Sequence, residues 1–145
     1  MGNRVYFTLK NETEERTYYT HWNGGLDTWC PLVKVILDHD IRDIGLIIEF
    51  ITQKLRLKIE FQTDVEARYW IEENGHYTID LDRKTFEHLT EHRASPVDQR
   101  RRRMLYSMQD EFESYLAKHI REEFREKSRL KYWDGIVKAG KEFFK

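Results

Sequence analysis

The 145-residue chain has a single cysteine, almost no net charge and no long apolar run. Cys30 alone cannot form an internal disulfide, which fits a protein of the reducing cytosol. No window approaches the roughly 20 apolar residues that a membrane-spanning helix requires. The first residues lead straight into a strand-like pattern, without the apolar core of a signal peptide. We therefore expect a cytoplasmic protein that does not enter a membrane.

The net charge of −1 excludes two classes of partner-binding protein. A value so close to zero argues against a strongly basic nucleic-acid-binding protein and equally against an acidic mimic of DNA. Charged residues make up 35% of the chain and aromatic residues 14%, so a polar surface accompanies large side chains that can fill a core. The length favours one domain.

The N-terminal pattern predicts a hairpin followed by a helix. Residues 5–10 alternate apolar and polar side chains, and residues 17–22 are β-branched or aromatic, so both segments favour strands. Asp27 or Thr28 can then cap a helix, and Pro31 is acceptable in its first turn, where the backbone N–H groups have no partner within the helix.

The middle of the chain changes from a helical to a strand period. A second helix is predicted over residues 41–55, and Asp40 with Asp43 resembles its capping box. Asn74-Gly75 is typical of a type I′ hairpin turn. Three further strands are predicted over residues 55–61, 65–71 and 77–81. The sequence thus predicts an α+β fold: an antiparallel sheet of about five strands packed by helices, with a long C-terminal helical segment.

The last third of the chain favours helices. Asp82 can cap a short helix that carries Phe86 and Leu89, and Ser95-Pro96 is typical of the start of a longer one. We expect an α+β domain over residues 1–92 and a helical segment over residues 96–145, packed together as one domain. The apolar stripe of that segment can pack back onto the sheet or form the interface of a homodimer, and the sequence favours neither.

The most pointed catalytic pattern is His88-Leu89-Thr90-Glu91-His92. On a helix, His88 and His92 lie one turn apart and can both ligate zinc while Glu91 acts as general base, as in the H-x-x-E-H pattern of the inverzincin proteases. Glu111 or Glu113 would have to supply another ligand. Nothing else resembles the substrate chamber of such an enzyme, so we interpret the pattern as a solvated helix end and rank a zinc hydrolase last of three hypotheses.

Arg100 to Arg103 form the only basic run. Four consecutive residues on a helix cover its whole circumference, so at most two can face one phosphate track. Surface charge on a helix is the plainer interpretation. The alternative is an electrostatic contact between an acidic partner or nucleic acid and Arg100, Arg101 and Arg103.

The other polar candidates have structural interpretations. Asp38-His39-Asp40 is taken as a turn, because consecutive residues do not converge on one metal ion without special backbone geometry. We expect His76 to face solvent, His119 to occupy a helix boundary position and Cys30 to fill the core. The sequence has no phosphate-binding glycine loop and no serine-based nucleophile motif, and we expect no cofactor.

The stretch from Tyr18 to Trp29 combines a strand end, a glycine turn and a helix start. In one interpretation its two tryptophans clamp the hairpin onto the helix. In the other interpretation, free N–H groups at the helix N-terminus bind a phosphate or carboxylate, and an aromatic ring stacks on a base. This requires that the Asp27 carboxylate, which would repel an anion, turns away from the site. The residues of that site would be His21, Trp22, Asn23, Gly24 and Trp29.

This stretch resembles the aromatic-x-His-aromatic-Asp/Asn-Gly opening of small uncharacterised proteins encoded by phages and mobile elements. The resemblance covers residues 18–37, and its motif positions are Tyr19, His21, Trp22, Asn23 and Gly24. The commoner form has Asp where Asn23 stands and Tyr-Pro in place of Gly25-Leu26. The resemblance implies a small phage or mobile-element product, located in the cytoplasm of the host cell, that binds a host factor or a signalling ligand, as anti-CRISPR and other anti-defence inhibitors do.

These observations lead to three ranked hypotheses. The first is a non-enzymatic binding protein, an inhibitor of a host defence system whose partner is a host protein or nucleoprotein complex. The second is a nucleotide-binding sponge or small phosphodiesterase centred on His21 and Trp22. The third is the zinc hydrolase that uses His88 and His92.

Overall fold

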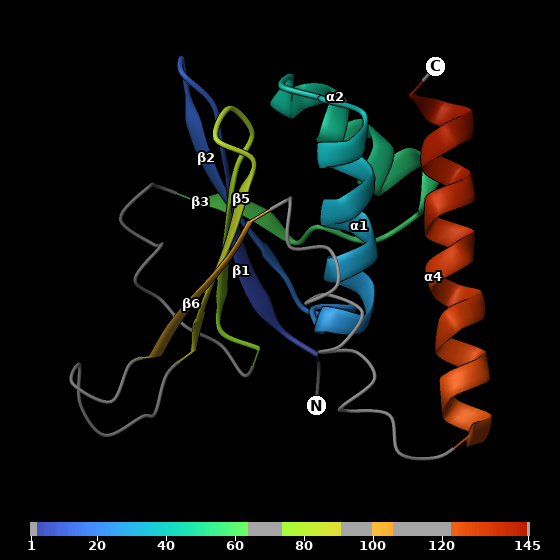
Figure 1. Cartoon of the computed structure of the whole chain (residues 1–145). Helices are drawn as coiled ribbons and strands as arrows, with labels where there is room; N and C mark the ends of the chain where they lie inside the picture. Colours follow the sequence, from blue (N-terminus) through green and yellow to red (C-terminus); the bar gives the residue numbers. More distant parts are fainter. Residues whose placement is uncertain (1–2, 64–73, 91–99, 106–122, 145) are drawn as a thin grey trace.

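The computed structural model describes residues 3–63, 74–90, 100–105 and 123–144. A six-stranded sheet, in the order β3-β2-β1-β4-β5-β6, has helices on one face. In Figure 1, α1 lies between the sheet and α4, so the helices form two layers on that side. The expected α+β fold is confirmed, with a sheet that is antiparallel except for one parallel pair, β1 with β4.

The N-terminal hairpin forms as predicted. β1 (Val5–Lys10) pairs antiparallel with β2 (Glu15–Thr20). Asn11 closes the turn, because its side-chain oxygen accepts the backbone N–H groups of Thr13 and Glu14 at 2.9 Å each. Alternation along β1 then sends Val5, Phe7 and Leu9 into the core, all with no exposed surface.

Helix α1 (Leu26–Asp38) is buried on nearly every side. Its apolar run packs against the sheet on one side and α4 on the other, as expected of a helix that is apolar all round. The helix starts earlier than expected: its N-cap is Gly25, which makes no side-chain capping bond, so neither Asp27 nor Thr28 caps it. Pro31 consequently lies inside the helix, beyond its first turn.

The second predicted helix divides into two elements. α2 (Ile44–Glu49) begins at Asp43, whose carboxylate accepts the Leu46 N–H at 3.2 Å, so Asp40 has no capping role. The π-helix η1 (Phe50–Lys54) follows directly, and Leu55 N–H bonds to Phe50 O at 3.0 Å. The expected strand over residues 55–61 is wrong for residues 55–60, because only β3 (Phe61–Thr63) joins the sheet, beside β2.

The short helix expected after Asp82 is also wrong. β4 (His76–Asp80) and β5 (Thr85–Thr90) form an antiparallel hairpin, joined by residues 81–84 with Lys84 at φ 54°. Phe86 and His88 are both buried, and the alternate residues Thr85 and Glu87 are half-buried, the two-residue period of a strand. Gly75 has φ 87°, but the segment 65–71 expected to precede its turn lies outside the described residues.

The C-terminal part contributes both a strand and a helix. Residues 100–105, expected to be helical, form β6 (Arg100–Leu105) at the edge of the sheet beside β5. α4 (Glu123–Phe143) confirms the C-terminal helix and packs on α1. Trp133, Ile136 and Phe144 from this region are buried in the main core. The predicted helix start at Ser95-Pro96 and the stretch 106–122 lie outside the described residues.

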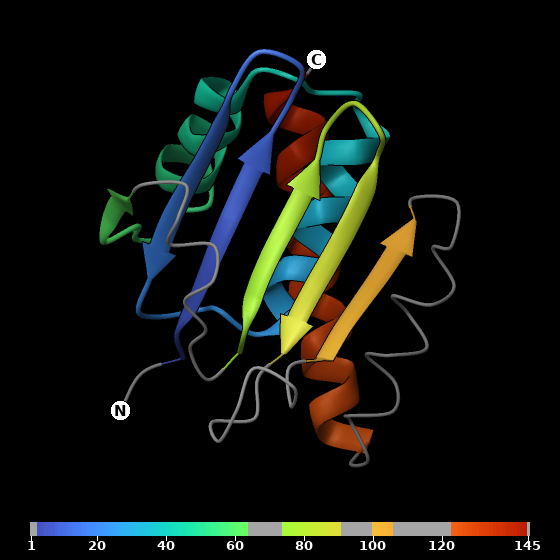
Figure 2. The same ribbon diagram turned by 90° about the vertical axis from the view of Figure 1, so that its left-hand side faces the viewer.

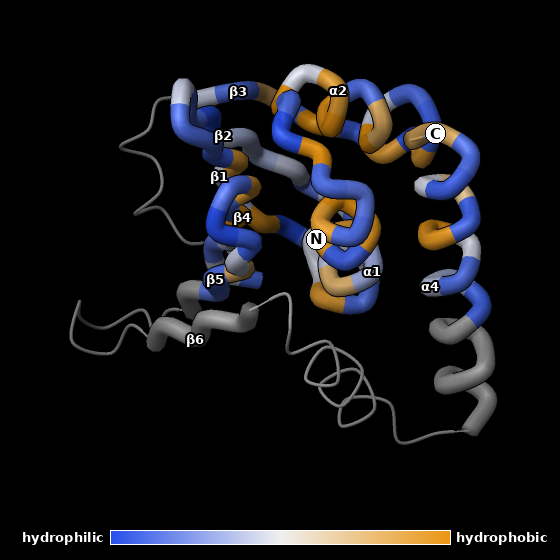
Figure 3. The backbone as a smooth tube through the Cα atoms, turned by 45° about the horizontal axis from the view of Figure 1, so that its top comes forward, coloured by the Kyte–Doolittle hydropathy of each residue, from blue (hydrophilic) through white to orange (hydrophobic). Residues whose placement is uncertain are grey.

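Apolar residues gather where the strands, α1 and α2 face one another (Figure 3). Figure 2 shows the other face of the sheet, with the helices behind it. No helix in the described ranges is both long and apolar enough to cross a bilayer.

Candidate partner-binding surface

The turn between β2 and α1 is held by hydrogen bonds from three directions. Thr20 Oγ1 donates to Trp22 O at 2.7 Å and lies 3.0 Å from Lys58 O. The Asn3 N–H donates to His21 O at 2.8 Å, and the Gly24 N–H donates to Asn3 O at 2.8 Å. Asn23 has φ 58°, the left-handed conformation that asparagine tolerates better than most residues. These bonds hold the backbone of the turn, while the Trp22 and Asn23 side chains stay exposed.

Two of the predicted site residues lie in the interior. Trp29 has only 1% of its surface exposed, and its ring lies 4.4 Å from that of Phe7 and 5.5 Å from that of Tyr77. Gly24 is buried, and its carbonyl accepts the Tyr77 hydroxyl at 2.7 Å. Trp29 and Gly24 therefore join the helix to the sheet. The structural interpretation of this stretch holds for Trp29, whereas Trp22, the other tryptophan expected to clamp the hairpin, is 51% exposed.

The N-terminus of α1 carries its own carboxylate. Asp27 lies in the first turn, and its Oδ1 would be 2.6 Å from a Cβ built on Gly25. The N–H groups of Thr28 and Trp29 bond to Gly25 O at 3.1 Å each. A negative charge this close to the helix terminus repels a second anion. The geometry therefore disfavours the phosphate pocket considered from the sequence.

His21 and Trp22 instead belong to an aromatic strip, which we define as Tyr6, Tyr19, His21, Trp22 and Phe61. Strand pairing places Tyr6 opposite Tyr19 and Tyr19 opposite Phe61, on the face turned away from the helices. Ring centroids are 5.0 Å apart for Tyr6–Tyr19, 5.0 Å for Tyr19–Phe61 and 4.9 Å for His21–Trp22. The Tyr19 hydroxyl lies 3.1 Å from His21 Nδ1 and links the two halves.

The strip is open to solvent at its outer end. Trp22 is 51% exposed and Phe61 44%, and with Tyr132 they are the exposed large apolar side chains of the described chain. Tyr6, at the inner end, is only 7% exposed and rests beside the ring of His76 at 6.2 Å. The strip thus offers two accessible rings on an aromatic support of buried Tyr6 and half-buried Tyr19.

A buried polar cluster lies beside this support. Thr8 Oγ1 is 2.8 Å from His76 Nε2 and 2.8 Å from Thr17 Oγ1, and all three residues are at most 1% exposed. The expectation that His76 faces solvent is wrong, because the residue lies within β4, opposite Tyr6 of β1, and its ring contacts Thr8. These bonds fix the neighbouring strands, so the strip has a rigid base.

The sequence motif contains three of the five residues of the strip. Tyr19, His21 and Trp22 belong to the motif, whereas Tyr6 and Phe61 do not. Phe61 joins Tyr19 only because β3 pairs with β2 across more than forty residues, and no local pattern specifies that pairing. The alternation along residues 5–10 did contain a signal, since it places Tyr6 on the face opposite Phe7.

The arginine run does not join the strip. Arg100, Arg101 and Arg103 belong to β6, and the sheet order places β6 at the edge opposite β3. Nearer the strip, in the chain before β3, Arg56 and Lys58 are exposed and Lys58 Nζ lies 3.5 Å from Glu60. The sequence therefore supplies two separate basic segments rather than one continuous basic surface.

The first three residues of the histidine pattern, 88–90, lie in a strand and not in a helix. His88 lies in β5, is 7% exposed, and its Nε2 is 2.8 Å from Asn74 O, while His92 lies outside the described residues. Among residues 3–63, 74–90, 100–105 and 123–144, no three His, Cys, Asp or Glu side chains converge as a metal site.

The remaining candidates have local partners. His39 Nδ1 is 2.8 Å from Val35 O, and Asp38 accepts Lys34 Nζ at 2.7 Å, so the Asp38-His39-Asp40 segment ends α1. Cys30 is buried in the core as expected. His119, Glu111 and Glu113 lie outside the described residues.

Comparisons of the chain with models of protein families, with curated proteins and with solved structures found no match. The resemblance of residues 18–37 to phage and mobile-element proteins therefore stays a prediction. The geometry itself defines a class: an α+β protein with a rigid sheet that presents an exposed aromatic strip at one edge.

Proposed function

We propose that the protein is a non-enzymatic binding protein whose aromatic strip docks on a macromolecular partner. The observation that carries this proposal is the exposure of Trp22 and Phe61 on a base of packed rings. Aromatic side chains dominate binding energy at interfaces because they bury a large area with few rotatable bonds. A strip that is already ordered loses little conformational entropy when a partner binds.

We further propose that the partner is a host protein or nucleoprotein complex and that binding inhibits a host defence system, as anti-CRISPR proteins do. The support is the sequence resemblance of residues 18–37 together with the strip. Tyr19, His21 and Trp22 are motif positions of the resemblance and also rings of the strip, so one surface accounts for both. The protein then acts by occupying a surface that the defence complex needs.

A capture experiment tests this proposal. The tagged chain is expressed in bacterial hosts and its partners are quantified for the wild type, Trp22→Ala, Phe61→Ala and Tyr132→Ala. Tyr132 is a matched control, since it is 40% exposed but lies on α4, away from the strip. We expect one stoichiometric partner that the two strip variants lose and the control retains. Capture of the same partner by all four proteins, or of none in any host, contradicts the proposal.

A separate experiment tests whether the protein inhibits a defence system. The chain is expressed in a strain with an active CRISPR system that targets an infecting phage, and the efficiency of plating is measured. We expect plating to rise with the wild type and with Tyr132→Ala, and to stay at the background level with Trp22→Ala. An equal rise with Trp22→Ala would show that inhibition does not use the strip, and no rise in any defended strain would refute the anti-defence role.

The nucleotide-sponge hypothesis is favoured by one observation, the exposed Trp22 ring beside His21, on which a base can stack. Asp27 at the helix terminus weighs against it. A thermal-shift screen with cyclic and linear nucleotides separates the two hypotheses, because a ligand at about 100 times its Kd adds about 2.7 kcal/mol of stability. The proposed function predicts no shift with any nucleotide. A shift that Trp22→Ala abolishes would favour the sponge.

A further inference from the structure

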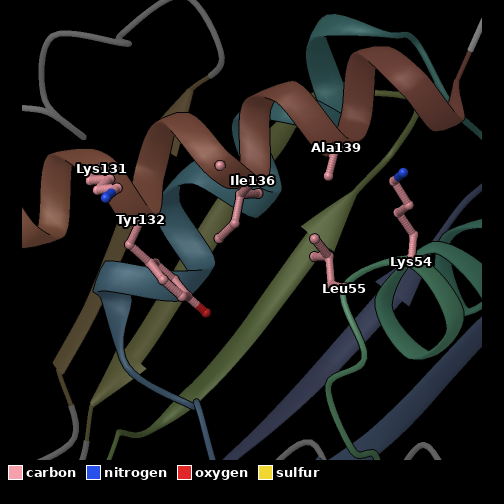
Figure 4. A pocket seen from close by; sticks show the side chains of 7 residues that line it. Lys54, Leu55, Lys131, Tyr132, Ile136 and Ala139 are labelled. Carbon is pink, nitrogen blue, oxygen red and sulfur yellow. The ribbon is translucent and has the colours of Figure 1, made fainter.

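A second surface, away from the strip, has the features of a ligand site. A groove of about 520 Å³ lies between α4 and the end of η1. It is lined by Lys54, Leu55, Lys131, Tyr132, Gly135, Ile136 and Ala139. Figure 4 shows side chains of α4 pointing across it toward Leu55, with the two lysines at opposite ends. Four of its seven lining residues are exposed, so it is an open groove on the surface rather than an enclosed cavity.

The two glycines of α4 distinguish this groove from ordinary helix packing. A Cβ on Gly140 would collide with Val35, so that glycine permits the close contact between α4 and α1. A Cβ on Gly135 would meet no atom within 4 Å. Glycine inside a helix costs about 1 kcal/mol relative to alanine, and at Gly135 no contact offsets that cost. Gly135 therefore keeps open a recess in the groove wall.

The other wall is formed where the π-helix ends. Leu57 N–H bonds to Ile51 O at 3.0 Å, and Arg56 between them has φ 56°, so the chain turns sharply after Leu55. π-Helical segments are rare and are often found at functional sites. Here the turn places Lys54 and Leu55 opposite α4.

The charged residues of the groove indicate which charge the ligand carries. Its middle is apolar, and among the described residues its charged lining residues are Lys54 and Lys131. Lys54 Nζ is already 2.8 Å from Glu142, whereas Lys131 is exposed at the other end. A molecule complementary to this arrangement has an apolar body that covers Leu55, Ile136 and Ala139 and an anionic head at Lys131.

We propose that this groove binds a small amphipathic carboxylate, with its hydrocarbon body in the recess at Gly135 and its carboxylate paired with Lys131. The site is independent of the proposed partner-binding function, because none of its lining residues belongs to the aromatic strip. The protein then has a second binding site, whose ligand belongs to the class of medium-chain fatty acids.

Calorimetric titration of the full chain with decanoate, below its micellar concentration, tests the proposal. We expect saturable binding of one molecule and none of decyltrimethylammonium, which has the same body and the opposite charge. Lys131→Gln should weaken decanoate binding about tenfold, or about 1.4 kcal/mol. Lys138→Gln is the matched control, since Lys138 is an exposed residue of α4 that does not line the groove, and its affinity should equal that of the wild type.

Gly135→Leu fills the recess and should abolish binding. Because leucine favours a helix more than glycine does, this variant should melt no lower than the wild type, so loss of binding cannot be attributed to unfolding. Trp22→Ala should bind decanoate normally, which separates this site from the strip. Absence of saturable decanoate binding to the wild type, equal binding of the cation, or unchanged binding by Gly135→Leu would each overturn the proposal.

Discussion

Gly24 is the residue on which the turn into α1 depends most, because backbone atoms fill the space around it. A Cβ at this position would lie 2.5 Å from Asn3 O and 3.0 Å from the carbonyl carbon of Arg4. Backbone held in a sheet cannot move away at low cost. We expect Gly24→Ala to lower the free energy of unfolding by about 1–3 kcal/mol, measured by urea denaturation.

Gly25→Ala is the control for this prediction. Its added Cβ would come too close to Asp27 Oδ1, at 2.6 Å, which is the end of a flexible carboxylate that can rotate away, and would make ordinary contact with Asn3 Nδ2 at 3.5 Å. The loss should therefore be clearly smaller than for Gly24→Ala. Equal losses in the two variants would contradict the assignment of Gly24 as the residue with no room for a side chain.

The Thr8 hydroxyl gives a second residue-scale prediction. It lies 2.8 Å from both His76 Nε2 and Thr17 Oγ1 in a buried place. Thr8→Val keeps the shape but removes a hydrogen-bond partner from each of two buried groups. Such a change costs about 1–3 kcal/mol. Thr78→Val, at a half-buried position of β4, should cost less in the same thermal denaturation measurement, and the reverse order would refute the role of the cluster.

At the scale of elements, α4 predicts opposite effects for one substitution at two glycines. Gly140→Ala places a methyl group against Val35 and should destabilise the protein, because α4 and α1 must separate. Gly135→Ala meets nothing and should stabilise it by about 1 kcal/mol through helix propensity. Chemical denaturation of both variants measures the difference. A gain at Gly140 or a loss at Gly135 would contradict the packing described.

The elements also show what the sequence can and cannot predict. The β1–β2 hairpin, α1 and the C-terminal helix were predicted, since each is specified by a local period. The sequence predicts helices for β5 and β6, because Asp82 and Ser95-Pro96 are typical of helix starts. Pairing with β4 decides the structure of β5, and that partner is not visible in a local pattern.

The residues of the candidate site also differ in whether a local pattern reveals them. His21 and Trp22 lie in one continuous motif and were found from it. Phe61 could not be found, because it contributes to the strip only through the pairing of β3 with β2. The recess at Gly135 was equally hidden, since only the packing of α4 on α1 distinguishes that glycine from Gly140.

At the scale of the whole molecule, the two proposed binding surfaces lie on opposite sides of the sheet. Helices cover one face of the sheet and bury its apolar residues, whereas the aromatic strip lies on the other face near the edge strand β3. The groove between α4 and η1 lies on the helical side. A partner on the strip and a ligand in the groove can therefore be bound without sharing residues.

The affinity of the captured partner for the purified chain tests the central claim most directly. Removal of an exposed aromatic anchor at an interface costs about 2 kcal/mol or more, so Trp22→Ala should weaken binding about 30-fold. Phe61→Ala should weaken it in the same direction, and Tyr132→Ala should leave the Kd unchanged. A Kd for Trp22→Ala and Phe61→Ala equal to that of the wild type would contradict the claim that the aromatic strip is the partner-binding surface.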